Sequence, residues 1–203
     1  MIEKTYLAAI DYSMSCPAIC IHENKEITDF NDCFVFFYTD IIKYQKVFNK
    51  NIIGMKTHKY KDQQERFDNL SEWALTILKK FNVKKVYIEG YSFGSKGQVF
   101  QIGENTGILK NKLYKNKINF ETIAPTQVKL SFSGKGNSKK DLMLETFKEK
   151  FNIDLLEILN YEKKTIDSPI GDIVDCVAIF NDAYHEKNNI NIKKKGKIKN
   201  VKN

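Results

Sequence analysis

The first forty residues alternate between short apolar runs and turn-forming polar residues. Apolar runs at 6–11, 18–22 and 33–38 each have the length and the composition of a β-strand. Because short connections join them, they predict an antiparallel meander. The segment that follows, 43–61, carries six lysines and reads as a basic loop or an insertion.

A helical period replaces this pattern after residue 61. Asp62 and Glu65 have the spacing of a capping box, which marks the start of a helix. Apolar residues then recur at three- and four-residue steps along one face. These residues are Phe67, Leu70, Ala74, Ile77 and Phe81. The next apolar run, 85–89, predicts a fourth strand that ends in an acid.

A second helix and a fifth strand follow. The helix is expected over about 98–117, with Gly103 and Gly107 permitting close packing. Its apolar face comprises Val99, Ile102, Thr106, Leu109 and Leu113. Residues 119–124 predict the fifth strand, which Pro125 ends.

Two more helices complete the chain. Ser138 with Asp141 predicts the start of a third helix, which runs to about Phe151. Ser168 followed by Pro169 is typical of an N-cap and a first helical turn, and predicts a last helix over roughly 169–186.

The order of these elements predicts the fold class. Three meander strands, followed by alternating helices and strands, favour an α/β fold with a mixed five-stranded sheet flanked by helices. This is the secondary-structure order of the ribonuclease H-like fold. The 203 residues suit one domain, which we assign to residues 1–186.

Charge separates the end of the chain from the rest. The formal net charge is +8, and residues 187–203 contribute seven lysines and no acid, which leaves +1 for residues 1–186. We expect 187–203 to be a basic, disordered tail. Such a tail acts either as an electrostatic tether to nucleic acid or as a solubilising end.

Other composition features exclude several protein classes. No run approaches the roughly 18 apolar residues of a membrane span, and the first residues do not read as a signal peptide, so we expect a cytoplasmic protein with no membrane partner. The cysteines form no CxxC pair, and the histidines supply no zinc spacing. Reduced, buried thiols are therefore expected at Cys16, Cys20, Cys33 and Cys176.

Four carboxylates stand out by their position. Asp11 and Glu89 each end a predicted strand, where functional groups gather in parallel sheets. Solvation of a strand end is the alternative reading for either residue alone. Asp172 and Asp175 lie three residues apart on one face of the last predicted helix. The helix dipole explains an acid in the first turn, but it explains Asp175, deeper among apolar neighbours, less well.

A divalent cation would account for such a group of acids. Carboxylates without matching histidine or cysteine ligands favour hard oxygen coordination, hence Mg²⁺ or Mn²⁺. The chemistry that such a cluster serves is phosphodiester hydrolysis with two ions. One ion activates water, and the other stabilises the leaving oxygen.

These residues stand in motifs that resemble a known family. The motifs occur in the order and spacing of RuvC-type Holliday junction resolvases, and the likeness spans roughly residues 5–185. They are Ala-Ala-Ile-Asp-Tyr-Ser at 8–13, Tyr-Ile-Glu-Gly at 87–90, Ala-Pro-Thr-Gln-Val-Lys at 124–129, a basic glycine-rich turn at 133–140, and Asp-Ile-Val-Asp-Cys-Val-Ala at 172–178.

The resemblance implies a homodimeric, Mg²⁺-dependent endonuclease that acts on four-way and other branched DNA. It further implies that Asp11, Glu89, Asp172 and Asp175 are the catalytic metal ligands, holding two Mg²⁺ ions per site with Mn²⁺ as a substitute. The composition, rich in Lys, Asn and Ile, suggests a bacteriophage member, which would act in the host cytoplasm. The segment at 43–61 and the basic tail are not typical of the bacterial enzymes.

Basic and aromatic residues near the acids are the candidate DNA contacts. Lys129, Lys135, Lys139 and Lys140 surround a glycine-rich turn, which is either a phosphate site or a solvated helix end. Lys135 is also a candidate catalytic residue that neutralises the scissile phosphate.

The loop after Glu89 carries further candidate contacts. Tyr91 and Phe93 straddle the position where the family uses an aromatic against junction bases, and Lys96 follows them. The alternative for the aromatics is packing beneath the loop.

Two other function classes compete with a nuclease. A noncatalytic nucleic-acid-binding module on the same fold would keep the basic surface but need not keep four acids. A sugar-kinase or actin-like ATPase shares a first strand that ends in Asp, but it needs a longer chain with two such domains.

Overall fold

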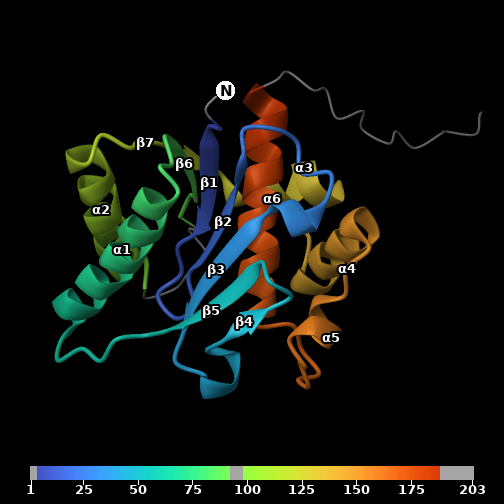
Figure 1. Cartoon of the computed structure of the whole chain (residues 1–203), viewed down its shortest axis with the longest axis horizontal. Coiled ribbons are helices and arrows are strands. Elements are labelled where there is room, and N and C mark those ends of the chain that lie inside the picture. Colours follow the sequence, from blue (N-terminus) through green and yellow to red (C-terminus); the bar gives the residue numbers. More distant parts are fainter. Residues whose placement is uncertain (1–3, 92–97, 188–203) are drawn as a thin grey trace, which may run out of the picture.

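A seven-stranded mixed sheet runs through the computed structural model, which describes residues 4–91 and 98–187 (Figure 1). The strand order is β4-β5-β3-β2-β1-β6-β7. The strands are β1 (Tyr6–Asp11), β2 (Ala18–Glu23), β3 (Phe34–Thr39), β4 (Val47–Phe48), β5 (Ile52–Lys56), β6 (Lys85–Glu89) and β7 (Asn119–Ile123). The helices are α1 (Gln63–Lys80), α2 (Val99–Lys115), α3 (Pro125–Ser133), α4 (Lys140–Phe151), α5 (Leu155–Ile158) and α6 (Ile170–Lys187), with 3-10 turns η1 (Phe30–Asp32) and η2 (Ile42–Tyr44).

The predicted meander and the mixed character of the sheet are confirmed. β1 pairs antiparallel with β2, and β2 pairs antiparallel with β3. β1 also pairs parallel with β6, which pairs parallel with β7. The carboxyl ends of β1, β6 and β7 therefore meet at one edge of the sheet.

The prediction of five strands was wrong, because residues 43–61 are not a loop. They form η2, β4 and β5, and β5 extends the sheet by pairing parallel with β3. Asn49 and Lys50 make the turn between β4 and β5 with φ of 44° and 62°. Lysines interrupt the apolar runs here, and β4 has only two residues, so alternation alone gave too weak a signal. Gly54 is required, since a Cβ there would lie 1.7 Å from the Tyr44 carbonyl oxygen.

Helices cover both faces of the sheet (Figure 1). α6 packs against β1, β2 and β6, with α3 and α4 beside it. α1 and α2 pack together on the opposite face, where Ala8 and Ile10 of β1 belong to their apolar cluster. Leu7 and Ala9 belong to the cluster on the α6 side. The alternation along β1 thus divides the core into two layers.

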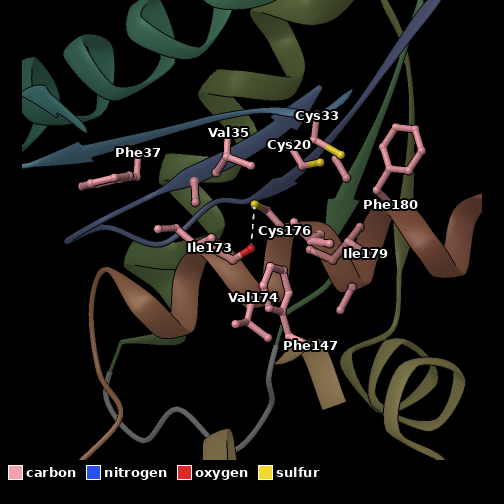
Figure 2. Packing of buried hydrophobic residues seen from close by; sticks show 14 of the residues in the cluster. Cys20, Cys33, Val35, Phe37, Phe147, Ile173, Val174, Cys176, Ile179 and Phe180 are labelled. Atoms are coloured by element: carbon pink, nitrogen blue, oxygen red, sulfur yellow. Dashed lines mark hydrogen bonds between the residues drawn. The ribbon is translucent and has the colours of Figure 1, made fainter. Parts of the chain in front are cut away.

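Three cysteines lie among the buried side chains of the α6 layer, as Figure 2 shows. Cys20, Cys33 and Cys176 are completely buried in this layer, and Cys176 Sγ lies 3.2 Å from the Ile173 carbonyl oxygen. Cys16, Cys20, Cys33 and Cys176 are all free and buried, which confirms the expectation of unpaired core thiols.

The predicted start of α1 is confirmed. Asp62 Oδ1 accepts the Glu65 backbone N–H at 2.8 Å. Glu65 Oε2 accepts the backbone N–H of Lys61 at 2.7 Å, one residue earlier than in an ideal capping box. The Asp62 side chain thus satisfies one of the backbone donors that the first turn of a helix leaves without an intrahelical partner.

Other helix boundaries differ from the predictions. Ser138 does not cap a helix, because α4 begins at Lys140 and the Ser138 hydroxyl donates to the Lys135 carbonyl at 2.7 Å. α3 was not predicted, although Pro125 in its first turn and Gly134 in the left-handed conformation (φ 79°) mark its two ends. The single-turn α5 was also missed.

Gly103 and Gly107 do not bring α2 close to its own chain. A Cβ built at either glycine meets no atom within 4 Å among the described residues. α2 packs on the sheet layer through Thr106, Leu109 and Leu113 instead. No helix of residues 4–91 and 98–187 has the length and hydropathy of a membrane span.

Candidate active site

Two of the predicted acids lie next to each other at the carboxyl edge of the sheet. Asp11 ends β1 and Glu89 ends β6. The two strands are parallel and in register, with Ile10 opposite Ile88. The strand pairing therefore brings together two side chains that lie 78 positions apart in the sequence.

The alternation of the strands turns both acids toward α6. Ala9, two residues before Asp11, and Tyr87, two residues before Glu89, both belong to the apolar cluster on the α6 side. Side chains two residues apart in a strand share a face. Asp11 and Glu89 thus extend the row that packs against α6.

α6 supplies the other two acids from its first turns. Asp172 is buried, with 9% of its surface exposed, and Asp175 is half-buried. Ile173 and Val174 beside them are buried in the apolar layer of Figure 2, so that layer holds the acidic end of the helix against the sheet edge.

Burial and nearby negative charges raise the pKa of all four acids. Burial raises the pKa of Asp11 well above its ordinary value, and the charges of Asp172, Glu89 and Asp175 raise it further. Burial and the charge of Asp175 raise the pKa of Glu89 to about 7. Burial and the charge of Asp172 raise the pKa of Asp175 to about 6. The chain therefore gathers carboxylates where their charges repel one another.

Asp172 has the most enclosed position. Burial raises its pKa, although Ser168 and Lys140 act in the opposite direction. Its Oδ2 atom is buried and has no hydrogen-bond partner in the described part of the chain. A buried carboxylate oxygen without a partner is costly for the fold, and it fits a donor that is reserved for a cation.

The acids do not form a closed coordination shell. Among residues 4–91 and 98–187, no three Asp, Glu, His or Cys side chains are arranged so that they could hold a metal ion as they stand. The donor set is nevertheless suited to Mg²⁺ or Mn²⁺, since it consists of carboxylate oxygens.

The comparison with known families agrees with this geometry. The family model of "Crossover junction endodeoxyribonuclease RuvC" matches residues 43–179 of this chain. The chain belongs to the RuvC family. Glu89, Asp172 and Asp175 lie inside the matched region, and Asp11 lies before it. The match begins at residue 43, so the segment interpreted as an insertion is part of the region that the family model covers.

Individual RuvC proteins are distant from this chain. The crossover junction endodeoxyribonuclease RuvC of Prochlorococcus marinus (strain NATL2A) is 24% identical over 99 residues, which is 49% of this chain and 64% of that protein. The match thus spans less than two thirds of the curated relative.

Solved RuvC structures share the fold over a greater length. Thermus thermophilus RuvC superimposes with a TM-score of 0.58 at 15% identity and covers 91% of this chain and 97% of its own. The same protein in complex with a Holliday junction gives 0.59 at 12% identity, covering 91% and 96%. The RuvC-like α/β fold is therefore confirmed, with a mixed sheet between helices.

A cleft of about 550 Å³ opens beside Asp11 and Glu89. Its wall continues through Ser13 to Ser15, which follow Asp11, and through Tyr91 after β6. α2 contributes Gln98 and Gln101. The two strand-end acids of this RuvC-family chain are thus reached from outside through a polar cleft.

Two of the predicted lysines lie near the acids. The charge of Lys140 lowers the pKa of Asp11, Asp172 and Asp175, and its Nζ lies 3.5 Å from the position of a Cβ on Gly171. The charge of Lys129 lowers the pKa of Glu89 and Asp175. These two lysines partly offset the repulsion between the carboxylates.

The other predicted contacts lie farther out or outside the described residues. Lys135 and Lys139 are exposed in the turn between α3 and α4. The Tyr91 ring lies under Lys110 Nζ of α2, at 5.4 Å. Phe93 and Lys96 lie outside the described residues, as does the tail beyond residue 187.

Sequence reasoning missed Arg66, which lines the cleft from α1. Its N–H donates to the Met14 carbonyl at 2.7 Å. The sequence does set Arg66 apart, because it is the sole arginine of the chain. Its spacing from Asp11, however, does not indicate that the two lie at the same cleft.

Proposed function

We propose that this chain is a divalent-metal-dependent endonuclease that cleaves four-way DNA junctions and other branched DNA. The observation that carries the proposal is the meeting of carboxylates from β1, β6 and α6 at one sheet edge, where burial and neighbouring acids raise the pKa of Asp11, Glu89 and Asp175. Membership in the RuvC family supports the substrate class. The relative solved with a Holliday junction supports it as well.

The acids would hold the cations and would not attack the DNA themselves. Asp11, Glu89, Asp172 and Asp175 would supply carboxylate oxygens, and the Oδ2 of Asp172 has no hydrogen-bond partner among the described residues. Two Mg²⁺ ions, when bound, supply an activated water and stabilise the leaving 3′ oxygen. Burial of the carboxylates strengthens their interaction with any cation that enters.

The lysines and the aromatic loop would place the phosphodiester over the acids. Lys129 and Lys140 lie within electrostatic reach of the cluster, and Lys135 and Lys139 extend the basic surface outward. We keep Lys135 as a candidate for neutralising the scissile phosphate. Tyr91 borders the cleft, and Tyr91, Phe93 and Lys96 would contact opened bases and phosphates at the crossover.

A homodimer would place two such sites on one junction. Two symmetric nicks require two active sites related by a two-fold axis. α2 carries an unpartnered stripe on one face, formed by Phe100, Gly103, Gly107 and Tyr114. Phe100 and Tyr114 are 86% and 77% exposed, and the glycines face open space within the described residues. This α2 stripe is our candidate dimer interface.

The cleavage assay that tests the proposal uses four-way, three-way and linear duplex DNA with Mg²⁺. We expect metal-dependent cleavage of the four-way junction and little cleavage of the linear duplex. A protein that binds the junction and never cuts it, with Mg²⁺ or Mn²⁺ present, would instead be the noncatalytic module. Four partly or fully buried acids with raised pKa values are difficult to explain in such a module.

The dimer is tested by replacing the exposed aromatics of the α2 stripe. The double change Phe100→Ser with Tyr114→Ser should convert the protein to monomer in sedimentation and turn paired cuts into single nicks. Since both side chains are exposed, the melting temperature of the subunit should change little. A wild-type protein that sediments only as monomer while it cuts both strands in concert would contradict the dimer.

The tail 187–203 would add a shape-independent contact to DNA. Its deletion should weaken binding equally for all DNA shapes and reduce the salt dependence, because lysine–phosphate contacts carry no information on shape. An unchanged salt slope would make the tail a solubilising end. The phage origin and the cytoplasmic location stay predictions from composition.

A further inference from the structure

A second depression in the surface adjoins the active-site cleft at Arg66, which lines both. The cleft shares Met14, Ser15 and Arg66 with a narrow pocket of about 100 Å³. That pocket shares His58 and Tyr60 with an open depression of about 500 Å³. We name the lining of these two neighbouring pockets the side groove, and its members used below are Lys56, His58, Lys59, Tyr60 and Arg66.

Arg66 stands at the junction of the cleft and the side groove. One of its N–H groups donates to the Met14 carbonyl at 2.7 Å, and its guanidinium lies 5.4 Å from the centre of the Tyr60 ring. Among residues 4–91 and 98–187, Arg66 forms no salt bridge with a carboxylate. A guanidinium has five N–H donors in one plane, so Arg66 can bond the carbonyl, lie over the ring and still present several donors to a ligand.

Tyr60 is a half-exposed aromatic on a segment that has no regular secondary structure but is well anchored. The Asn69 amide donates to the Lys59 carbonyl at 3.3 Å. The His58 backbone N–H donates to the Tyr38 hydroxyl at 2.8 Å. Tyr38 in turn stacks on Trp73 with ring centres 5.1 Å apart. Tyr60, 51% exposed, is therefore presented from a fixed support.

The charge of the side groove favours an anion. Lys56, Lys59 and Arg66 line it, against one carboxylate, Asp40. Aromatic rings beside cations form the surface that binds an unpaired nucleic-acid strand, since bases stack on the rings and phosphates pair with the cations. The side groove adjoins the cleft that holds Asp11 and Glu89, so a nucleic-acid strand in the cleft could extend into it.

We propose that the side groove binds the DNA strand that leads away from the scissile phosphate, with Arg66 on a phosphate and Tyr60 stacked on an unpaired base. This inference rests on the proposed function and adds a strand path that the acid cluster does not define. The path would select DNA whose strands separate next to the cut, as they do at a branch point.

Binding measurements on uncut DNA test the proposal. We would measure fluorescence anisotropy of a labelled four-way junction with protein that carries Asp175→Asn, at several salt concentrations. Adding Tyr60→Ala should weaken binding by about tenfold and leave the salt slope unchanged, because stacking releases no counterions. Adding Arg66→Ala should weaken binding and reduce the salt slope by about one.

Two further variants separate contact from structure. Arg66→Lys keeps the positive charge but loses the planar set of N–H donors of the guanidinium. It should therefore keep the salt slope and still weaken binding. Lys79→Ala, at an exposed position at the far end of α1, is the matched charge control and should change neither. Thermal melts identify any variant that has lost its fold, and Arg66→Lys then replaces Arg66→Ala in the comparison.

Cross-linking locates the strand. The native cysteines are buried, so Lys59→Cys can carry a photoactivatable label, with Lys79→Cys as its control. The label at position 59 should react with the cleaved strand beside the scissile phosphate. Unchanged junction binding by the Tyr60 and Arg66 variants, or cross-links confined to distant arms, would overturn the side groove and leave the nuclease proposal standing. A wild-type protein that neither binds nor cuts junctions would overturn both.

Discussion

Two aspartates of this chain experience opposite environments. Asp175 lies half-buried among other acids, where burial and Asp172 raise its pKa to about 6. Asp154 caps α5, and the hydrogen bond from Lys148 at 2.6 Å lowers its pKa. The surroundings of Asp175 disfavour its charged form, whereas the surroundings of Asp154 favour its charged form. The first pattern is typical of a functional site, and the second of a structural contact.

The same substitution at the two positions should therefore have opposite consequences. Asp→Asn keeps the size of the side chain and removes its charge. At the acid cluster it should remove function and relieve repulsion. At the α5 cap it should leave function unchanged and weaken a local contact.

The largest expected effect is on cleavage. Asp175→Asn, and likewise Asp11→Asn or Glu89→Gln, should lower the rate of junction cleavage by orders of magnitude, because each removes a charged carboxylate from the proposed cation site. Junction binding should stay largely intact, since these acids contribute no attraction to phosphate. Gel-based cleavage and anisotropy on the same samples measure the two effects. Asp154→Asn is the control and should cleave at the wild-type rate.

The second-largest expected effect is on metal binding, which should distinguish the acid cluster from the α5 cap. Mg²⁺ or Mn²⁺ should raise the melting temperature of the wild-type protein, because a cation bound only by the folded state stabilises it. The shift should be much reduced in Asp175→Asn and retained in Asp154→Asn. Excess chelator should abolish cleavage. Full cleavage in excess chelator would contradict the cation-dependent reaction.

The third effect concerns stability without metal. Asp175→Asn should lose cleavage activity and yet be more stable than the wild-type protein. Asp175→Asn should raise the free energy of unfolding by about 1–3 kcal/mol at pH 8 without metal, since a buried charge among like charges is costly. Chemical denaturation in chelator measures it. A destabilised Asp175→Asn protein would mean that the carboxylate makes a structural contact that outweighs the repulsion.

Much of this contrast could be predicted from the sequence. Asp11 and Glu89 were found because each ends an apolar run that is too short for anything but a strand, and the parallel pairing of β1 and β6 then places them together. Asp172 and Asp175 were predicted to share one face of a helix because they lie three residues apart in a segment expected to be helical, and α6 contains both. These predictions depend on local patterns of residues, which can be read from the sequence without knowing the tertiary structure.

Other features depend on tertiary contacts and could not be read in this way. β5 is a strand because β3 offers it an edge, although its own sequence has no clear alternation. Arg66 reaches Met14 across 52 positions, and no local pattern predicts that contact. Lys140 was grouped with Lys135, but the packing of α4 beside α6 brings Lys140 to the acids, and that depends on helix packing.

The smallest expected effect concerns Asp154 and pH. Asp154 Oδ1 accepts the backbone N–H groups of Leu156 and Glu157 at 3.0 and 3.3 Å, and Oδ2 accepts from Lys148. Its pKa is lowered in the folded protein, so its contribution is fully present above the pKa of an unfolded aspartate, about 4, and is lost as the pH falls through the lowered value.

Asp154→Asn should therefore cost about 1 kcal/mol or less near pH 7, because asparagine still caps a helix and the lysine contact is exposed to solvent. The difference between the two proteins should shrink below pH 4, where the wild-type carboxylate takes up its proton. Denaturant titrations at several pH values measure it, in a background of Asp175→Asn so that the acid cluster contributes less to the slope. A difference that grows as the pH falls would show that the stabilising form of Asp154 is the protonated one, and the contrast between the two aspartates would then be lost.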